Sequence, residues 1–142
     1  MSDDERRARI VDVAIELSQS RGFDAMGLRE VAERAGVALG TLYKSFSSKE
    51  AIIGAAVLQQ THAIRRQFDR RPAEGDTVLE RIGDLFSRLT RALARRPALA
   101  RTVLGAISTN HPDIAGAVLQ HEGETTRIIV AAMRGVTPQV VD

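Results

Sequence analysis

Helical spacing of apolar residues runs through almost the whole sequence, and it limits the fold more than any other feature. Apolar side chains recur three or four residues apart, and no segment keeps the alternating pattern of a half-buried strand. We therefore expect an all-α protein. Its 142 residues are enough for one domain, or for a small head on a larger body.

Glycine, proline and capping residues predict where the helices begin and end. Apparent capping boxes stand at Ser47 with Glu50 and at Thr77 with Glu80. The predicted helices cover residues 3–20, 28–35, 39–45 and about 47–68, and three more begin near 77, 97 and 112. Thr137 then resembles the cap of a further helix, so we expect the body to lack its last helices.

The two short helices at residues 28–35 and 39–45 form a predicted helix-turn-helix. They are joined by a turn of the expected length, and Gly36 suits a position with positive φ. The polar loop RRPAEGD at residues 70–76 separates a head from a body in composition. We assign residues 1–47 to a helix-turn-helix DNA-binding domain and residues 48–142 to a helical body, whose effector-binding role is implied by the family resemblance given below.

The second short helix carries the residue types that a DNA-reading helix needs. Gly40 lets the backbone approach a duplex, and Thr41 and Tyr43 offer hydroxyl groups. Of the 20 basic residues only Lys44 and Lys49 are lysines, and both lie in or beside this segment. At the start of the next helix, Lys49 is placed to bind phosphate together with free backbone N–H groups.

The run REVAERAGVALGTLYKSFSSKEAI resembles the DNA-binding signature of TetR-family repressors. The resemblance extends from Arg9 to Ile53 and implies a three-helix head followed by the start of a fourth helix. It departs from the family at Gly27, where a threonine is common, and at Ser45, where many members have His or Tyr. The implied DNA-binding residues are Arg29, Leu39, Gly40, Thr41, Tyr43, Lys44 and Lys49.

The same resemblance implies a cytoplasmic homodimer that binds a palindromic operator and releases it when a small effector enters the body. Apolar inner positions favour a hydrophobic effector. The segments SRLTRALARRPALARTVL and RIIVAAMRG are similar to the KstR-like sterol-catabolism group, whose effector is a steroid or its coenzyme A thioester. Candidate effector residues, each of which core packing could equally explain, are Phe86, Leu89, Leu104, Ile107, Val118 and His121.

Other function classes have little support in the sequence. The chain has no cysteine, and no apolar run approaches the roughly 18 residues of a membrane span. Its three histidines lack metal-ligand spacing, and no nucleophile stands beside a base. We therefore expect no metal, no cofactor and no enzymatic activity. The remaining alternative is a helical protein-interaction module that does not bind DNA.

Overall fold

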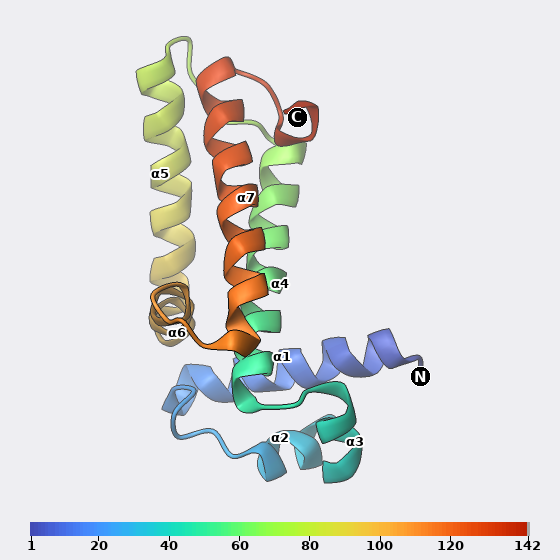
Figure 1. Ribbon diagram of the computed structural model, residues 1–142. Helices are drawn as coiled ribbons and strands as arrows, with labels where there is room; N and C mark the ends of the chain where they lie inside the picture. Colours follow the sequence, from blue (N-terminus) through green and yellow to red (C-terminus); the bar gives the residue numbers. More distant parts are fainter. Residues whose placement is uncertain (142) are drawn as a thin grey trace. The chain divides into compact units, whose positions relative to one another are not determined.

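The computed structural model describes residues 1–141, which form seven α-helices, one 3₁₀ helix and no strand (Figure 1). The all-α class predicted from the spacing is confirmed. None of the helices described is long and apolar enough to span a bilayer. The elements are α1 (Asp3–Arg21), α2 (Leu28–Ala35), α3 (Leu39–Ser45), α4 (Lys49–Arg70), α5 (Val78–Arg95), α6 (Pro97–Ile107), α7 (Pro112–Arg134) and η1 (Pro138–Val140).

The chain divides into two compact units. Unit 1 comprises Met1–Val57 and Arg96–Val118, and unit 2 comprises Leu58–Arg95 and the described residues from Leu119 onward. Both α4 and α7 therefore contribute to each unit. This division differs from the one predicted after residue 47, because α6 and the start of α7 belong with the first three helices. The assignment of roles to residues 1–47 and 48–142 stays a prediction.

Local capping fixes both ends of α1. The Ser2 hydroxyl accepts a hydrogen bond from the Glu5 N–H, and the Glu5 carboxylate accepts one from the Ser2 N–H, which completes a capping box. At the other end Gly22 has φ 76°, and its N–H donates to the Ser18 carbonyl. The glycine thus ends the helix as the sequence predicts.

The helix-turn-helix forms at the predicted residues. Gly36 is left-handed, with φ 70° and ψ 33°, and the Val37 N–H reaches back to the Ala32 carbonyl, as in a Schellman motif. Val37 is half-buried and packs against the core between the two helices. The turn therefore combines a left-handed conformation that favours glycine with an apolar side chain packed between the two helices.

The fourth helix begins one residue later than its apparent capping box suggests. Ser48, and not Ser47, accepts the capping hydrogen bond, from the Ala51 N–H at 3.1 Å. The Ser48 hydroxyl also donates to Asp113 Oδ2 at 2.5 Å. Because Phe46 is extended, with φ −138° and ψ 118°, the turn after α3 places the second of the two serines at the helix end.

The core of unit 1 joins the first three helices to α6. Leu42 of α3 and Val31 of α2 are fully buried, and Leu99 of α6 belongs to the same apolar cluster. A smaller cluster combines Val57, Ala106 and Ile114. Two of the contributing segments lie far apart in sequence, so the head is completed by residues that periodicity alone assigns to the body.

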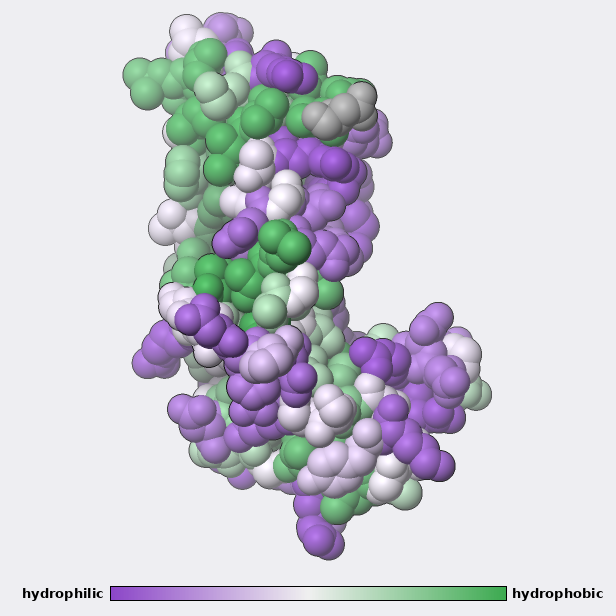
Figure 2. Space-filling view, viewed as in Figure 1, coloured by the Kyte–Doolittle hydropathy of each residue, from purple (hydrophilic) through white to green (hydrophobic). Residues whose placement is uncertain are grey.

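Unit 2 is built from the second half of α4, α5 and the second half of α7. Phe68, Leu85, Ile128 and Ala132 form its buried core. The predicted capping box at the start of α5 is present, since Glu80 N–H donates to the Thr77 hydroxyl and the Glu80 carboxylate accepts from the Thr77 N–H. Other apolar residues of α5 face outward, including Leu79, which is 81% exposed, and Figure 2 shows apolar surface along this helix.

One buried arginine fixes the loop between α4 and α5. The Arg88 guanidinium donates to the carbonyl groups of Arg71 and Pro72 at 2.6 and 2.9 Å, and it pairs with Asp84 at 2.6 Å. It also lies over the Phe68 ring, 4.9 Å from its centroid. Residues on both sides of the loop are thereby held by a single side chain of α5.

Candidate nucleic-acid interface

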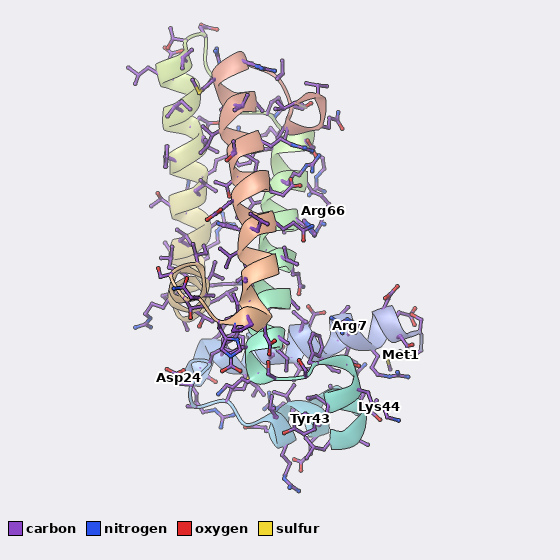
Figure 3. All side chains as sticks on the ribbon, viewed as in Figure 1. Met1, Arg7, Asp24, Tyr43, Lys44 and Arg66 are labelled. Atoms are coloured by element: carbon purple, nitrogen blue, oxygen red, sulfur yellow. The ribbon has the colours of Figure 1, made fainter. Side chains whose placement is uncertain are left out.

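The helix α3 has one face in the core and one face open to solvent. Leu42 is 0% exposed, whereas its neighbour Tyr43 is 49% exposed. Lys44 is also exposed, and both polar side chains lie on the outer side of unit 1 near α2 and α3 (Figure 3). An exposed phenol beside an exposed ammonium group, on a helix anchored by a buried leucine, is an arrangement that can meet phosphate oxygens and base edges.

Smaller residues of α3 complete this face. Gly40 is exposed, and a Cβ placed there meets no atom within 4 Å. Thr41 is half-buried. Leu39 is half-buried and packs against the core of unit 1, so only part of its side chain is open to a duplex. The absence of a side chain at Gly40 is therefore not required by packing in the described chain, which leaves the approach of a ligand as a reason for it.

Replacing Gly40 by Ala should act in opposite directions on folding and on DNA binding. We expect the free energy of unfolding to rise by about 0.5 kcal/mol, because alanine is the better helix former and its methyl group meets nothing. Affinity for DNA should fall, because the methyl group occupies space needed by the duplex. Denaturant unfolding and a gel shift measure the two effects.

The matched control for Gly40→Ala is Gly116→Ala in α7, where a Cβ also meets nothing within 4 Å. This variant should gain stability and keep its DNA affinity. Unchanged DNA affinity in Gly40→Ala would mean that the backbone of α3 does not approach the duplex closely.

An exposed arginine of α1 holds the end of α3. The Arg7 guanidinium donates to the Ser45 carbonyl, and it lies over the Phe46 ring at 4.3 Å from the centroid. Phe46 is buried. Arg7 and Ser45 are 38 residues apart in sequence, so no local pattern indicates this contact.

Lys49 takes part in the fold as well as in the predicted interface. Its ammonium group donates to the Asp24 carbonyl at 3.0 Å, which ties the loop before α2 to the first turn of α4. An ammonium group has three donors, so two remain for a phosphate. The Ala51 N–H is already bonded to Ser48, and the predicted phosphate site would use the remaining N–H groups of that turn.

The first turn of α2 carries two charged residues, Glu30 in an ion pair and Arg29 exposed to solvent. Glu30 pairs with Arg21 at 2.6 Å. The hydrogen bond from Arg21 lowers the pKa of the Glu30 carboxyl, and the charges of Arg21 and Arg34 act in the same direction, against the effect of burial. Arg29 is exposed, and the described residues show no ion pair to it. Its guanidinium is therefore available to a flanking phosphate, as the resemblance implies.

All seven predicted DNA-binding residues thus lie in unit 1, on α2, α3 and the first turn of α4. Residues 10–56 match the model of the bacterial regulatory proteins of the tetR family. The HTH-type transcriptional repressor KstR of Mycolicibacterium smegmatis is 35% identical over 120 residues, which are 84% of this chain and 58% of that protein. A TetR transcriptional regulator from Rhodococcus sp. RHA1 superposes with a TM-score of 0.78 at 27% identity, over 94% of this chain and 71% of that one.

Residues 10–56, which contain the helix-turn-helix, belong to the TetR family. The resemblance to TetR-family repressors that the helix-turn-helix motif indicated is confirmed. The chain spans about 58% to 62% of the length of the KstR proteins that it matches. The regulator FadR of Bacillus subtilis, solved in complex with stearoyl-CoA, shares the fold at 20% identity and a TM-score of 0.70, over 90% of this chain and 69% of that one.

The six effector candidates fall in both units. Phe86 and Leu104 are each 55% exposed. Leu89 packs on the core of unit 2, and Val118 packs on the smaller cluster of unit 1. Ile107 is half-buried. The role of these residues in effector binding stays a prediction.

The sixth candidate, His121, is joined to a buried threonine. Thr61 Oγ1 lies 2.8 Å from His121 Nδ1. Arg65, which follows Thr61 by one turn of α4, pairs with Glu124 of α7 at 2.7 Å. Burial lowers the pKa of His121, although the charge of Glu122 opposes the shift. The lowered pKa favours the neutral imidazole, whose Nδ1 is engaged with the Thr61 hydroxyl. Within residues 1–141 no three or more acidic or histidine side chains are gathered as a metal site would need.

Proposed function

We propose that the protein is a ligand-responsive transcriptional repressor that binds a palindromic operator as a homodimer. The observation that carries this proposal is the geometry of α3, where Leu42 is fully buried and the adjacent Tyr43 and Lys44 are exposed. Each copy would place α3 in a major groove. The two grooves would lie roughly 34 Å apart, about one turn of the duplex.

The effector that we propose is a small hydrophobic metabolite, such as a steroid or an acyl coenzyme A. The likeness of the body to the KstR-like group supports it, and so does the shared fold with the FadR that was solved with stearoyl-CoA. The effector must bind the released conformation more tightly than the DNA-bound one, because equal affinity shifts no population. A coupling of about 1–3 kcal/mol is typical of such regulators.

A gel shift with the region upstream of the protein's own gene tests the proposal, since such repressors often control their own synthesis. Saturable binding that survives an excess of unrelated DNA is the expected result. Retention on heparin that falls with added salt separates this function from the alternative protein-interaction module, which should show no such dependence. Absence of both properties would contradict DNA binding.

Replacing Lys49 by Ala should weaken binding to all DNA sequences by a similar factor. One phosphate contact is lost, so the slope of log affinity against log salt should become shallower by about one. Arg66→Ala is the control, because Arg66 is an exposed cation of α4 outside the predicted interface. An unchanged slope in Lys49→Ala would assign Lys49 only to its bond with the Asp24 carbonyl.

A further inference from the structure

A cavity of about 670 Å³ lies within unit 1, between α6 and the end of α1 with its following loop. The loop contributes Gly22, Phe23 and Asp24, and Ile53 and Ile114 add apolar walls from α4 and α7. All of these residues belong to the same compact unit. The six effector candidates do not line it, so it is a separate feature of the molecule.

The cavity exists because α6 presents small residues toward α1. Ala98, Gly105 and Ala106 all line the cavity. A Cβ at Gly105 would meet no atom within 4 Å, and the same is true at Gly22 on the opposite wall. A larger side chain at Gly105 would enter this space without a clash, so the glycine at this position leaves the space open.

The polar groups around this space favour a molecule with an acidic end. Arg101 lines the cavity, is exposed, and has no ion pair among the described residues. Its planar guanidinium suits a carboxylate, which it can hold through two hydrogen bonds. The other lining arginine, Arg21, is already paired with Glu30. Asp24 supplies the one acidic side chain, so the two lining arginines outnumber it.

The last turn of α1 favours a hydrogen-bond donor on the ligand. Gln19, Ser20 and Arg21 form the last turn of α1 and line the cavity. The last carbonyl groups of a helix have no partner within the helix and accept hydrogen bonds from outside it. A ligand that fits therefore carries a carboxylate at one end and a hydroxyl or amino group at the other, with an apolar middle against Ile53 and Ile114.

We infer that this cavity binds a small amphipathic organic acid, whose carboxylate is held by Arg101 and whose donor group meets the end of α1. This site goes beyond the proposed effector pocket of the body. Its ligand would contact the loop that Lys49 holds through the Asp24 carbonyl, and it would thus lie against a segment that supports the DNA-binding helices.

The test uses para-coumarate as the probe, because it has a carboxylate, an apolar middle and a phenol. Nuclear magnetic resonance of the full chain should show saturable shifts of the Gly22 and Gly105 amide signals. The neutral amide of the probe and cinnamate, which lacks the phenol, should each bind more weakly. Arg101→Gln should lose about tenfold or more in affinity, whereas Arg9→Gln, an exposed arginine of α1 outside the cavity, should keep it.

A second pair of variants tests the space itself. Gly105→Leu should weaken the shifts at Gly22 by narrowing the cavity, and Gly116→Leu should leave them intact, since both glycines have room for a side chain. Shifts confined to the exposed apolar residues of α5, or equal affinity in Arg101→Gln and the parent chain, would overturn the proposal. The measurement needs no DNA, so its failure would leave the proposed repressor function standing.

Discussion

Tyr43→Ala should lower the affinity for operator DNA by about tenfold or more while leaving the melting temperature nearly unchanged. The side chain is 49% exposed, so its removal costs little packing. The loss of one good contact to phosphate or base corresponds to roughly 1–3 kcal/mol, and about 1.4 kcal/mol is a factor of ten. Fluorescence anisotropy with a labelled operator and thermal unfolding measure the two quantities.

Two further variants of α3 show what the Tyr43 result means. Tyr43→Phe removes the hydroxyl alone, so it should reproduce most of the loss if the phenol binds phosphate, and little of it if the ring contacts a thymine methyl. Leu42→Ala, unlike Tyr43→Ala, should lower the free energy of unfolding, by about 2–5 kcal/mol, because Leu42 is fully buried. A loss of stability in Tyr43→Ala as large as its loss of binding would support a role in packing instead.

Arg88→Met should lower the free energy of unfolding by about 3 kcal/mol. The substitution leaves Asp84 without its ion pair and two loop carbonyl groups without their donors. We expect a value near the lower end for such changes, because Arg88 Nε is buried without a partner and its removal relieves that cost. Denaturant unfolding measures the loss, and Arg91→Met, an exposed position of the same helix, should stay within about 0.5 kcal/mol of the parent chain.

The pH dependence of the stability loss in Arg88→Met shows whether Arg88 acts through its ion pair with Asp84 or through packing alone. Burial raises the pKa of Asp84, but hydrogen bonds from Glu74 and Arg88, with the charges of Arg88 and Arg71, outweigh it and lower the pKa overall. A carboxyl with a lowered pKa in the folded state stabilises the protein above its ordinary pKa of about 3.9, and this contribution is lost as the pH falls through the lowered value. The difference between parent and Arg88→Met should therefore narrow in acid. A constant difference between pH 7 and the acid range would argue that Arg88 acts through packing alone.

Helix bounds that depend on residues close together in the chain could be predicted from the sequence. The bounds of α2 and α3 follow from Gly36, which needs a left-handed conformation, and from apolar residues spaced for one helix face. The start of α5 follows from Thr77 and Glu80, whose reciprocal bonds span only three residues. These signals are strong because both partners lie within one turn of the chain.

Features that depend on distant residues could not be predicted in the same way. Arg7 has the spacing of a solvent-facing residue, and only the folded chain brings the Ser45 carbonyl within its reach. Ser47 and Ser48 carry the same hydroxyl, and the extended backbone at Phe46 decides which one caps α4. For the seven DNA-binding candidates the sequence predicts one surface, and the structure places them all in unit 1.

The packing of α6 against the first helices has a consequence for biosynthesis. A nascent chain that ends at residue 57 contains every predicted DNA-contacting residue, but it lacks Leu99, which belongs to the apolar cluster around Ile10 and Leu42. Residues emerge from the ribosome at about 5–20 per second, so for several seconds the predicted DNA-binding residues are present on a polypeptide that still lacks Leu99. We therefore expect the apolar cluster beneath these residues to be completed only after α6 has emerged, although α6 carries none of the predicted DNA-binding residues.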